Sequence, residues 1–448
     1  MLGHHCTSKK NNKQLYQLEE MKNLTQITFI MMLAVAATLV GCGTDDPVEP
    51  IVSAYEHSGF ISEDQTWDAN GIHILKDRVI VQEGVTLTIN PGAIIKGESG
   101  IGANAAMLLI ARGATIDAEG TPTEPIIFTS IADDIQLGQV NGTNLEAAKS
   151  KGFWGGVVIL GAAPVSPKTG ATEQIEGVPA NVAEGNYGGT DAEDNSGVFT
   201  YVSIRFGGAL IGEGNELNGL TLGGVGRGTT VNHIEVVGNV DDGIEFFGGT
   251  VNVDDAMVVY QGDDAFDIDQ AYAGTLDNFI YIAGADSDHG LEIDGPEGSE
   301  NAGGSFMLKN GSLQGNASAS EFADFRSKAQ GVVENCYFFG FNQNADVELD
   351  DDASSANYTS GALLLSGNSF NSTAWTVDGE GNPDGGTTTW SDIKDLFSDN
   401  SESGDAAAAD NKFAADGNAL VTTKTNGADK SEFTGWTLAD NEGLLTNF

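Results

Sequence analysis

A short acidic motif recurs along the chain at the spacing of one solenoid coil. The copies are DDGIEFF (241–247), DDAFDID (263–269) and DHGLEID (288–294), and a weaker copy, ADVELDD, occupies 345–351. Each copy alternates apolar and acidic residues, as a strand with one buried face does. Repeats at such an interval predict stacked coils, each contacting only its neighbours. We therefore expect a solenoid with a carboxylate at the same position of successive coils.

The composition limits the fold and the partners. The 60 Gly, the 10 Pro and the 40% hydrophobic content suit a long core with many tight turns better than long helices. The 65 acidic residues exceed the 20 basic ones, so the net charge is -45. That charge repels nucleic acid and anionic lipid headgroups. It leaves cations, neutral glycans or a basic protein surface as partners, or it serves only to keep an exposed protein soluble.

The amino-terminal region predicts export and lipidation. After Met21 and Lys22, residues 27–40 form a run without charge, which is short for a bilayer span but typical of a secretory signal peptide. The run ends in LVGC (39–42), which resembles the lipobox of bacterial lipoproteins, where the cysteine is acylated. We therefore interpret residues 1–20 as an overlong start, 21–41 as the signal peptide, Cys42 as the lipidated residue and 42–55 as a linker.

The residues after Cys42 indicate the destination. Gly43, rather than Asp, follows the cysteine, so retention at the inner membrane is not favoured. Asp45 and Asp46 come soon afterwards and resemble a surface-export signal of some Gram-negative groups. We expect a lipid-anchored protein of the outer membrane that faces the cell surface.

Short strand-like segments dominate the rest of the chain. From residue 79 to 129 they are rich in β-branched residues and separated by Gly, Pro or Asn. From residue 199 two columns of strands can be followed, and in the second the residues expected to face away from the core are Thr221, Glu245, Asp267, Glu292 and Glu348. We predict an all-β parallel β-helix over 56–370. Residues 371–448 should form an acidic, Gly-rich insertion and a cap, with 433–439 docking.

Polar residues precede several of these strands at regular intervals. The set comprises Asn232, Asp255, Asn278, Asn310 and Asn335. Side-chain amides at equivalent turns can hydrogen-bond to one another and to the turn backbone. We interpret them as a structural ladder rather than as a ligand site.

Longer segments carry a family resemblance. NPGAIIKG (90–97), ARGATIDAEGTPTEPIIFTS (111–130), FWGGVVILG (153–161) and DDGIEFFGGTVN (241–252) resemble secreted or lipid-anchored bacterial proteins with a right-handed parallel β-helix of the pectin-lyase-like type. The resemblance covers about residues 58–340. It implies the fold, and it adds little on function because that family lacks an agreed activity.

The aligned acids predict a calcium site. Two full charges about 5 Å apart repel by about 0.8 kcal/mol in water and about 3 kcal/mol at an effective dielectric constant of about 20. Bound protons or a divalent cation would relieve this repulsion, and calcium takes six to eight oxygen ligands. We expect Glu245, Asp267, Asp269, Glu292 and Asp294 to form one or two such sites. The alternative is a solvated acidic face that binds nothing.

Other motifs point to ordinary turns. Residues 286–290 (DSDHG) begin like a calcium loop, yet Leu291 takes the position that needs Gly. GGVGRGT (223–229) lacks the Lys of a phosphate loop. His289 could be a general acid, but we favour a turn histidine that is satisfied by its carboxylate neighbours. No organic cofactor is expected.

Two functions remain open. The favoured one is a surface-exposed β-helix that acts as a binding or structural module for a glycan or a protein, supported by calcium. The alternative is a polysaccharide hydrolase or lyase that uses Asp242, Asp264 and Asp267, because neighbouring coils supply carboxylate pairs at the spacing that hydrolases need. A deep groove would favour the enzyme, and a flat acidic wall would favour binding.

Overall fold

The computed structural model describes residues 53–210, 217–296, 303–316, 321–342, 345–373, 397–399 and 412–448. The predicted signal peptide, Cys42 and the linker up to residue 52 lie outside this part of the chain. None of the helices in the described ranges combines the length and apolarity of a bilayer span.

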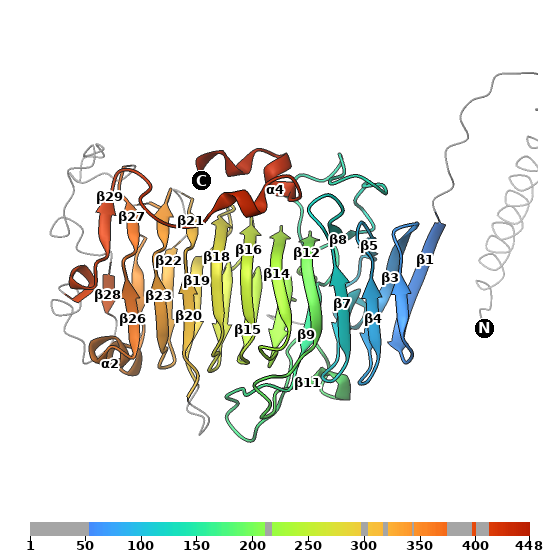
Figure 1. Cartoon of the computed structure of the whole chain (residues 1–448), viewed down its shortest axis with the longest axis horizontal. Coiled ribbons are helices and arrows are strands. Elements are labelled where there is room, and N and C mark those ends of the chain that lie inside the picture. Colours follow the sequence, from blue (N-terminus) through green and yellow to red (C-terminus); the bar gives the residue numbers. More distant parts are fainter. Residues whose placement is uncertain are drawn as a thin grey trace, which may run out of the picture. The chain divides into compact units, whose positions relative to one another are not determined.

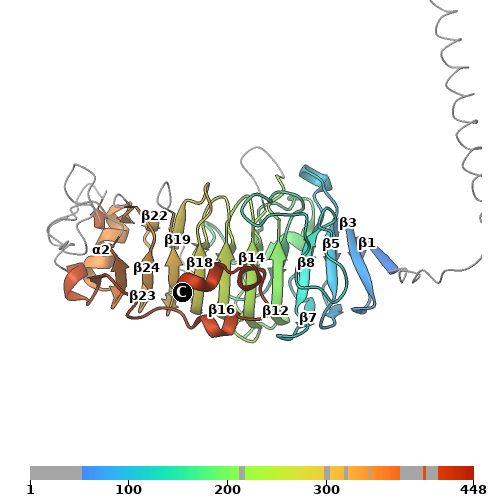
Figure 2. The same ribbon diagram turned by 90° about the horizontal axis from the view of Figure 1, so that it is seen from above.

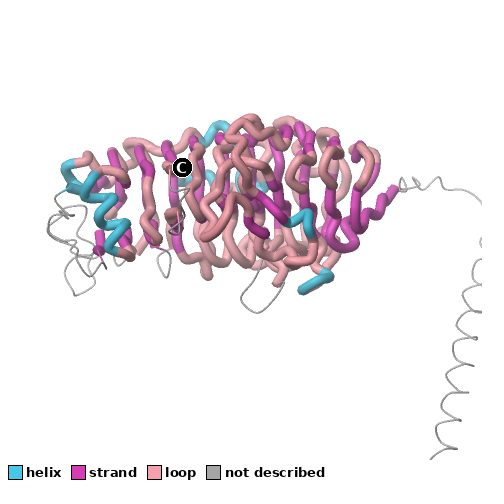
Figure 3. The backbone as a smooth tube through the Cα atoms, turned by 90° about the horizontal axis from the view of Figure 1, so that it is seen from below, coloured by secondary structure: helices cyan, strands magenta, loops and turns pink. Residues whose placement is uncertain are grey.

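Three columns of parallel strands form a β-helix. Successive coils lie side by side from β1 to β29 (Figure 1), and strands alternate with loops around each coil (Figure 3). Among the described strands every pair is parallel except β10 (Glu173–Gln174) with β11 (Asn186–Tyr187), which form a separate antiparallel ribbon. The predicted fold, a right-handed parallel β-helix, is confirmed.

The columns follow one another within each coil. Column 1 contains β2 (Gln65–Trp67), β4 (Thr86–Ile89), β7 (Thr115–Glu119), the first halves of β12 (Gly197–Arg205), β14 (Thr230–Val237), β16 (Asn252–Val259) and β18 (Thr275–Ile282), then β20 (Phe306–Lys309), β23 (Gly331–Glu334) and β26 (Leu363–Ser366). Column 2 contains the first halves of β1 (Ser53–Ile61) and β3 (Gly71–Val81), β5 (Ile94–Gly97), β8 (Ile126–Ser130), the second halves of the four long strands, β21 (Ser312–Gln314), β24 (Tyr337–Phe339), β27 (Ser369–Asn371) and β29 (Ala419–Val421).

Column 3 carries the acidic motif. It contains the ends of β1 and β3, β6 (Met107–Ile110), β9 (Val157–Leu160), β13 (Leu220–Gly223), β15 (Ile244–Phe247), β17 (Phe266–Asp269), β19 (His289–Asp294), β22 (Glu321–Arg326), β25 (Val347–Leu349) and β28 (Phe397–Asp399). The columns therefore begin at Ser53 and reach Val421, beyond the predicted 56–370. Much of the predicted insertion, 374–396 and 400–411, lies outside the described residues.

The core fills the interior of the coils. Inward-facing apolar residues of the three columns, such as Leu87 of column 1, Ile95 of column 2 and Phe246 of column 3, are fully buried and belong to one continuous cluster. Each adds about 1.5–3 kcal/mol through burial. The continuous core keeps neighbouring coils in fixed register, and this register positions the outward-facing side chains.

The corner between columns 1 and 2 carries a left-handed non-glycine residue in six successive coils. These residues are Tyr201, His233, Asp255, Asn278, Asn310 and Asn335, with φ from 50° to 58°, and we call them the corner ladder. Asn and Asp tolerate this conformation. Asn278 donates to Asp255 at 2.5 Å, and Asn335 donates to Asn310 at 2.5 Å. The predicted ladder is confirmed except at Asn232, because His233 takes the corner position in that coil.

Residues 428–448, which we call the C-terminal segment, cross column 2. Figure 2 shows this segment, in red, over β14, β16 and β18. It contains η3 (Lys430–Phe433), α4 (Leu438–Asn441) and η4 (Leu444–Asn447), and Phe433, Trp436 and Leu438 pack against outward-facing apolar residues of column 2 such as Met257 and Ile280. Another helix, α2 (Asp352–Ser360), lies between β25 and β26.

A buried carboxylate anchors this segment. Glu235 accepts hydrogen bonds from the backbone N–H groups of Leu438 and Ala439 at 3.0 and 2.9 Å. It also accepts one from the Ser203 hydroxyl at 2.5 Å and lies 3.7 Å from the Arg205 guanidinium. These contacts satisfy a charge that burial would otherwise make costly.

Candidate functional site

Five consecutive coils align one carboxylate each in column 3. The strand register places Glu245 beside Asp267, Asp267 beside Glu292, Glu292 beside Asp324, and Asp324 beside Glu348. We call these five residues the acid column. Thr221 precedes Glu245 in the same register, so the predicted alignment is confirmed. Asp324 was missed because β22 follows β19 after a longer interval, although EFADFR at Glu321–Arg326 shows the same alternation.

The first part of the acid column is covered rather than solvated. Glu245 is 5% exposed and Asp242, just before it, is 7% exposed. The loop of residues 162–196, which carries β10 and β11, packs over this part of column 3. Within that loop Val165 and Tyr187 belong to the same apolar cluster as Phe247, and the rings of Tyr187 and Phe247 have centroids 5.9 Å apart. The predicted outward direction is therefore right, but the exposure is lower than a flat acidic wall would have.

Asp242, Glu245 and Asp267 form a cluster that we call the buried acid cluster, in which Asp242 and Glu245 are buried and Asp267 is partly buried. One carboxylate oxygen of each lies within 4.8 Å of the others. Asn218 donates to Glu245, whereas Oδ1 of Asp267 is buried without a hydrogen-bond partner. Burial, and then the charges of neighbouring carboxylates, raise the pKa of all three groups well above the ordinary value. Each of the three therefore favours either a proton or a cation beside it.

Two basic side chains offset the negative charge in the middle of the acid column. Arg326 pairs with Glu292, lies 3.2 Å from Asp294 and lies 3.9 Å from Asp324. The ring of His289 lies 2.9 Å from Asp264 and 3.8 Å from Glu292. Burial alone would lower the pKa of His289, but the hydrogen bond with Asp264 and the charges of nearby acids raise it to about 9.

The far end of the acid column is again rich in acid. Oxygens of Asp324, Glu348 and Asp350 lie within 4.8 Å of one another. Burial and then the charge of Asp350 raise the pKa of Asp324 to about 7. Burial and then the charge of Glu348 raise the pKa of Asp346 to about 8.

The acids predicted to bind calcium thus fall into two environments. Glu245 and Asp267 join Asp242 in the buried acid cluster, where no Lys, Arg or His of the described residues forms an ion pair with them. Glu292 and Asp294 instead share the guanidinium of Arg326. One ion cannot bind all five predicted ligands in this arrangement, and the buried acid cluster is the better candidate.

Asp269, the remaining predicted ligand, lies at the end of β17. Its Oδ1 accepts the backbone N–H of Gln270 at 2.8 Å, and Gln270 has a left-handed φ of 64°. Gln270 in turn donates to the Tyr187 hydroxyl at 2.7 Å. Asp269 therefore helps to shape the turn against the covering loop.

Two of the three acids predicted for the enzymatic alternative, Asp242 and Asp264, bind backbone groups of the next coil. Asp242 accepts the N–H of Asp264 at 3.0 Å, and Asp264 accepts the N–H of His289 at 2.6 Å. Both acids are buried, with exposures of 7% and 3%. This arrangement holds successive turns in register, as turn-forming Asp residues do.

Two cavities among the described residues lie elsewhere. One, of about 290 Å³, is lined by Tyr55, His57, Trp67, His73 and polar neighbours at the first coils. Another, of about 370 Å³, is bordered by Arg112 and Glu184. No residue of the acid column lines either cavity. The stacked rings of the first cavity were not predicted, although His57 and His73 each stand in an alternating strand.

The comparisons with known proteins agree with this architecture. No curated protein and no solved structure matches the chain. A family model described as a pectate-lyase-like β-helix domain matches residues 59–421, which include every coil that carries the acid column. The chain therefore belongs to the family of pectate-lyase-like β-helix domains.

Proposed function

We propose that the protein is a calcium-supported binding module, anchored through Cys42 to the outer membrane and displayed at the cell surface. The β-helix presents the loops that flank the acid column to a glycan or to another surface protein, and the ion supports the coils beneath them. The observation that carries this proposal is the buried acid cluster of Asp242, Glu245 and Asp267, whose carboxylates lie together without a basic partner among the described residues.

Calcium fits the chemistry of this cluster. The ligands available are carboxylate oxygens, which calcium prefers over nitrogen or sulfur. When ionised, the three carboxylates place three negative charges within 4.8 Å, and Oδ1 of Asp267 has no hydrogen-bond partner. At neutral pH the repulsion among them must be reduced by protons or by a cation. A calcium ion would also tie two consecutive coils together and would keep the covering loop in place.

The surroundings favour binding over catalysis. A hydrolase needs a carboxylate pair that reaches the substrate in a groove. Here Asp242 and Asp264 are buried and accept backbone hydrogen bonds, and the two cavities at the first coils and beside Arg112 lie away from them. The negative charge further favours a neutral glycan or a basic protein patch over a uronate polymer or a nucleic acid.

Calorimetry tests the calcium part directly. The unit Val52–Phe448 should be titrated with calcium after chelator treatment, and its thermal unfolding should be followed in parallel. We expect binding heat and an increase in Tm. A matched variant, Asp267→Asn, should lose both effects, whereas Glu119→Gln, at an exposed position of β7, should keep them. Wild-type protein that shows neither heat nor stabilisation would refute the calcium proposal.

A polysaccharide panel tests the binding role. Purified protein should be retained by a neutral glycan or a surface-protein fraction in calcium and released by chelator. Reducing ends should not increase on prolonged incubation. Release of reducing ends that is lost in Asp264→Asn would instead establish the enzymatic alternative.

A further inference from the structure

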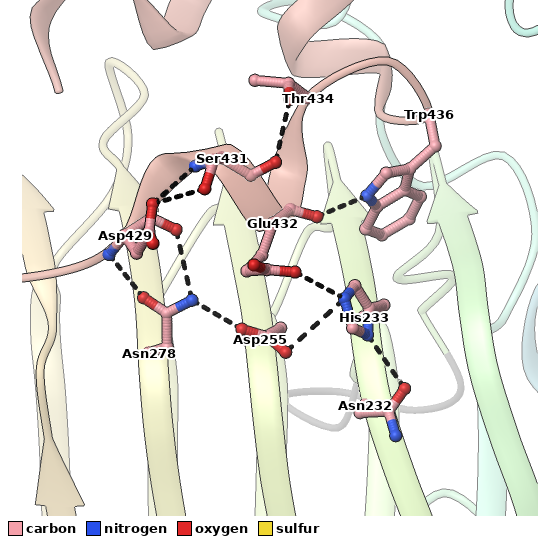
Figure 4. A network of polar contacts seen from close by, with 9 residues as sticks. All are labelled: Asn232, His233, Asp255, Asn278, Asp429, Ser431, Glu432, Thr434 and Trp436. Atoms are coloured by element: carbon pink, nitrogen blue, oxygen red, sulfur yellow. Dashed lines mark hydrogen bonds and ion pairs between the residues drawn. The ribbon is translucent and has the colours of Figure 1, made fainter. Parts of the chain in front are cut away.

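Another group of candidate metal ligands lies away from the acid column, where the C-terminal segment meets the corner ladder. It contains His233 of β14, Asp255 of β16 and Glu432 of η3 (Figure 4). His233 and Asp255 are ladder residues with left-handed backbones, at φ 52° and 57°. Glu432 comes much later in the chain and reaches the ladder because the C-terminal segment folds back across column 2.

The imidazole of His233 has one nitrogen committed to a neighbour. Nδ1 lies 2.9 Å from the side-chain oxygen of Asn232. An amide oxygen only accepts hydrogen bonds, so Nδ1 carries the proton of this contact. In neutral His233 the other nitrogen, Nε2, then presents a lone pair. Histidines that bind metals are oriented in this way, by a hydrogen bond from the nitrogen that faces away from the ion.

Nε2 of His233 faces two carboxylates. It lies 3.5 Å from Oδ2 of Asp255 and 3.3 Å from Oε2 of Glu432. A lone pair opposite two acceptors is unfavourable unless a positive species lies among the three atoms. Either a second proton on the imidazole or a metal ion meets this requirement.

The two distances from Nε2 match the spacing of ligand atoms around a tetrahedral ion, and all three atoms lie within 4.8 Å of one another. Bonds of about 2.0–2.1 Å from zinc to nitrogen and oxygen place neighbouring ligand atoms of a tetrahedron about 3.3–3.4 Å apart. The two distances from Nε2 are close to this value. One histidine and two carboxylates are also a ligand set that zinc accepts, with the fourth position left to solvent.

The ligands are held in place by contacts that need no ion. Asn278 donates to Oδ1 of Asp255 at 2.5 Å and also exchanges two hydrogen bonds with the backbone of Asp429, at 2.7 and 3.2 Å. Trp436 donates to the backbone oxygen of Glu432 at 2.8 Å. The ring of His233 stacks on Tyr201 with centroids 4.1 Å apart. This support is what a preorganised site requires.

From this geometry we infer that His233, Asp255 and Glu432 bind a zinc-type divalent ion that clamps the C-terminal segment to the β-helix. The ion joins β14, β16 and η3, so it stabilises the docked segment in addition to the apolar contacts of Trp436. The site differs from the acid column in its nitrogen ligand and in its position, and it does not depend on the proposed calcium binding.

Metal titration tests this inference. Chelator-treated protein should be titrated with zinc in the presence of saturating calcium, and with cobalt to record the visible absorption of a tetrahedral site. We expect one zinc ion per chain and slower protease cleavage of the C-terminal segment when zinc is present. His233→Gln and Glu432→Gln should remove both effects. Glu432 is about half exposed in its side chain, so its replacement leaves the fold intact.

Control variants separate a bound ion from an ion pair without metal. Glu119→Gln and Asp267→Asn should bind zinc as the wild type does. Asn232→Ala, which removes only the contact to Nδ1, should weaken binding about 10- to 100-fold. Wild-type protein that binds no zinc, or binding that survives in both His233→Gln and Glu432→Gln, would overturn the inference. If the wild type binds no zinc, the cluster is an ion pair of protonated His233 with two acids.

Discussion

At the scale of single residues, the buried acid cluster makes stability depend on pH. The folded pKa values of Asp242, Glu245 and Asp267 are raised by burial and by neighbouring charges, so the folded state holds protons that the unfolded chain has already lost. Stability that comes from such groups is fully present below the unfolded pKa, about 4, and is lost as pH rises through the folded pKa. Asp324, with a pKa of about 7, and Asp346, with a pKa of about 8, act in the same direction.

We therefore predict that chelator-treated protein becomes less stable as pH rises from about 5 to about 8. His289, with a pKa of about 9, extends the decline, because its protonated form is lost as pH passes that value. His57, whose pKa is lowered to about 4 by burial, opposes it by favouring the neutral form below pH 6.5. Urea unfolding at several pH values measures the free energy of unfolding, which contains the sum of these contributions. If the chelator-treated protein instead became more stable between about pH 5 and pH 8, the buried environments assigned to these acids would be wrong.

Replacing one acid of the buried acid cluster by a neutral residue should reveal the repulsion among its carboxylates. In chelator at pH 8, Asp267→Asn should be more stable than the wild type by about 1–3 kcal/mol, because it removes one charge from the cluster. At pH 5 the difference should shrink, since protons already reduce the charge. In calcium the order should reverse, because the variant lacks a ligand. Glu119→Gln, measured beside it, should show none of these changes.

At the scale of elements, the C-terminal segment is the part whose role depends most on tertiary contacts. Its apolar residues, Phe433, Trp436 and Leu438, follow no regular period, yet they cover outward-facing apolar side chains of column 2. Glu235 then binds the first residues of α4. The segment thus covers a face of the β-helix that would otherwise expose Met257 and Ile280.

We predict that Trp436→Ala destabilises the protein by about 3 kcal/mol, the lower end for a buried aromatic, because the segment can detach before the coils unfold. Denaturant unfolding gives the free energy, and protease cleavage after β29 reports detachment. Phe60→Ala provides the control: this ring is 56% exposed on β1, and its loss should change stability by less than about 0.5 kcal/mol. Equal effects of the two replacements would argue against a packed segment.

The repeat made the coils predictable, whereas the loops and the long-range contacts could not be predicted. Glu245, Asp267 and Glu292 could be aligned because strand alternation and the nearly constant interval of the motif leave one register. Asp324 was not predicted as part of the acid column because the interval from Glu292 to Asp324 is longer than the intervals between the earlier copies of the motif. The burial of Glu245 could not be predicted, since the covering loop belongs to a much earlier part of the chain. The meeting of His233 with Glu432 depends on a segment without repeats, so no sequence pattern indicated it.

At the scale of the whole molecule, the family match and the columns describe one continuous β-helix domain. Each coil contacts mainly its neighbours, so interactions that link coils add to stability coil by coil. Ions at the acid column and at the corner ladder would be such links. In a chain with a net charge of -45, we propose that this stack of coils presents an extended surface to its partner.

The proposed anchor leads to a prediction at this scale. Cys42→Ala should abolish incorporation of labelled fatty acid and should move the protein from the outer-membrane fraction to the soluble fraction. Ser53→Ala, in the first strand, serves as the control and should leave both properties unchanged. Unaltered labelling in Cys42→Ala would show that another residue carries the lipid, and absence of labelling in the wild type would refute the anchor.

Diffraction from crystals soaked in calcium or a lanthanide gives the most direct test of the central proposal, because anomalous scattering locates an ion among the carboxylates. We predict a peak bounded by Asp242, Glu245 and Asp267, with oxygens at about 2.3–2.6 Å from calcium. A map at saturating calcium with no peak beside these residues, and with their oxygens close enough to share protons, would contradict it.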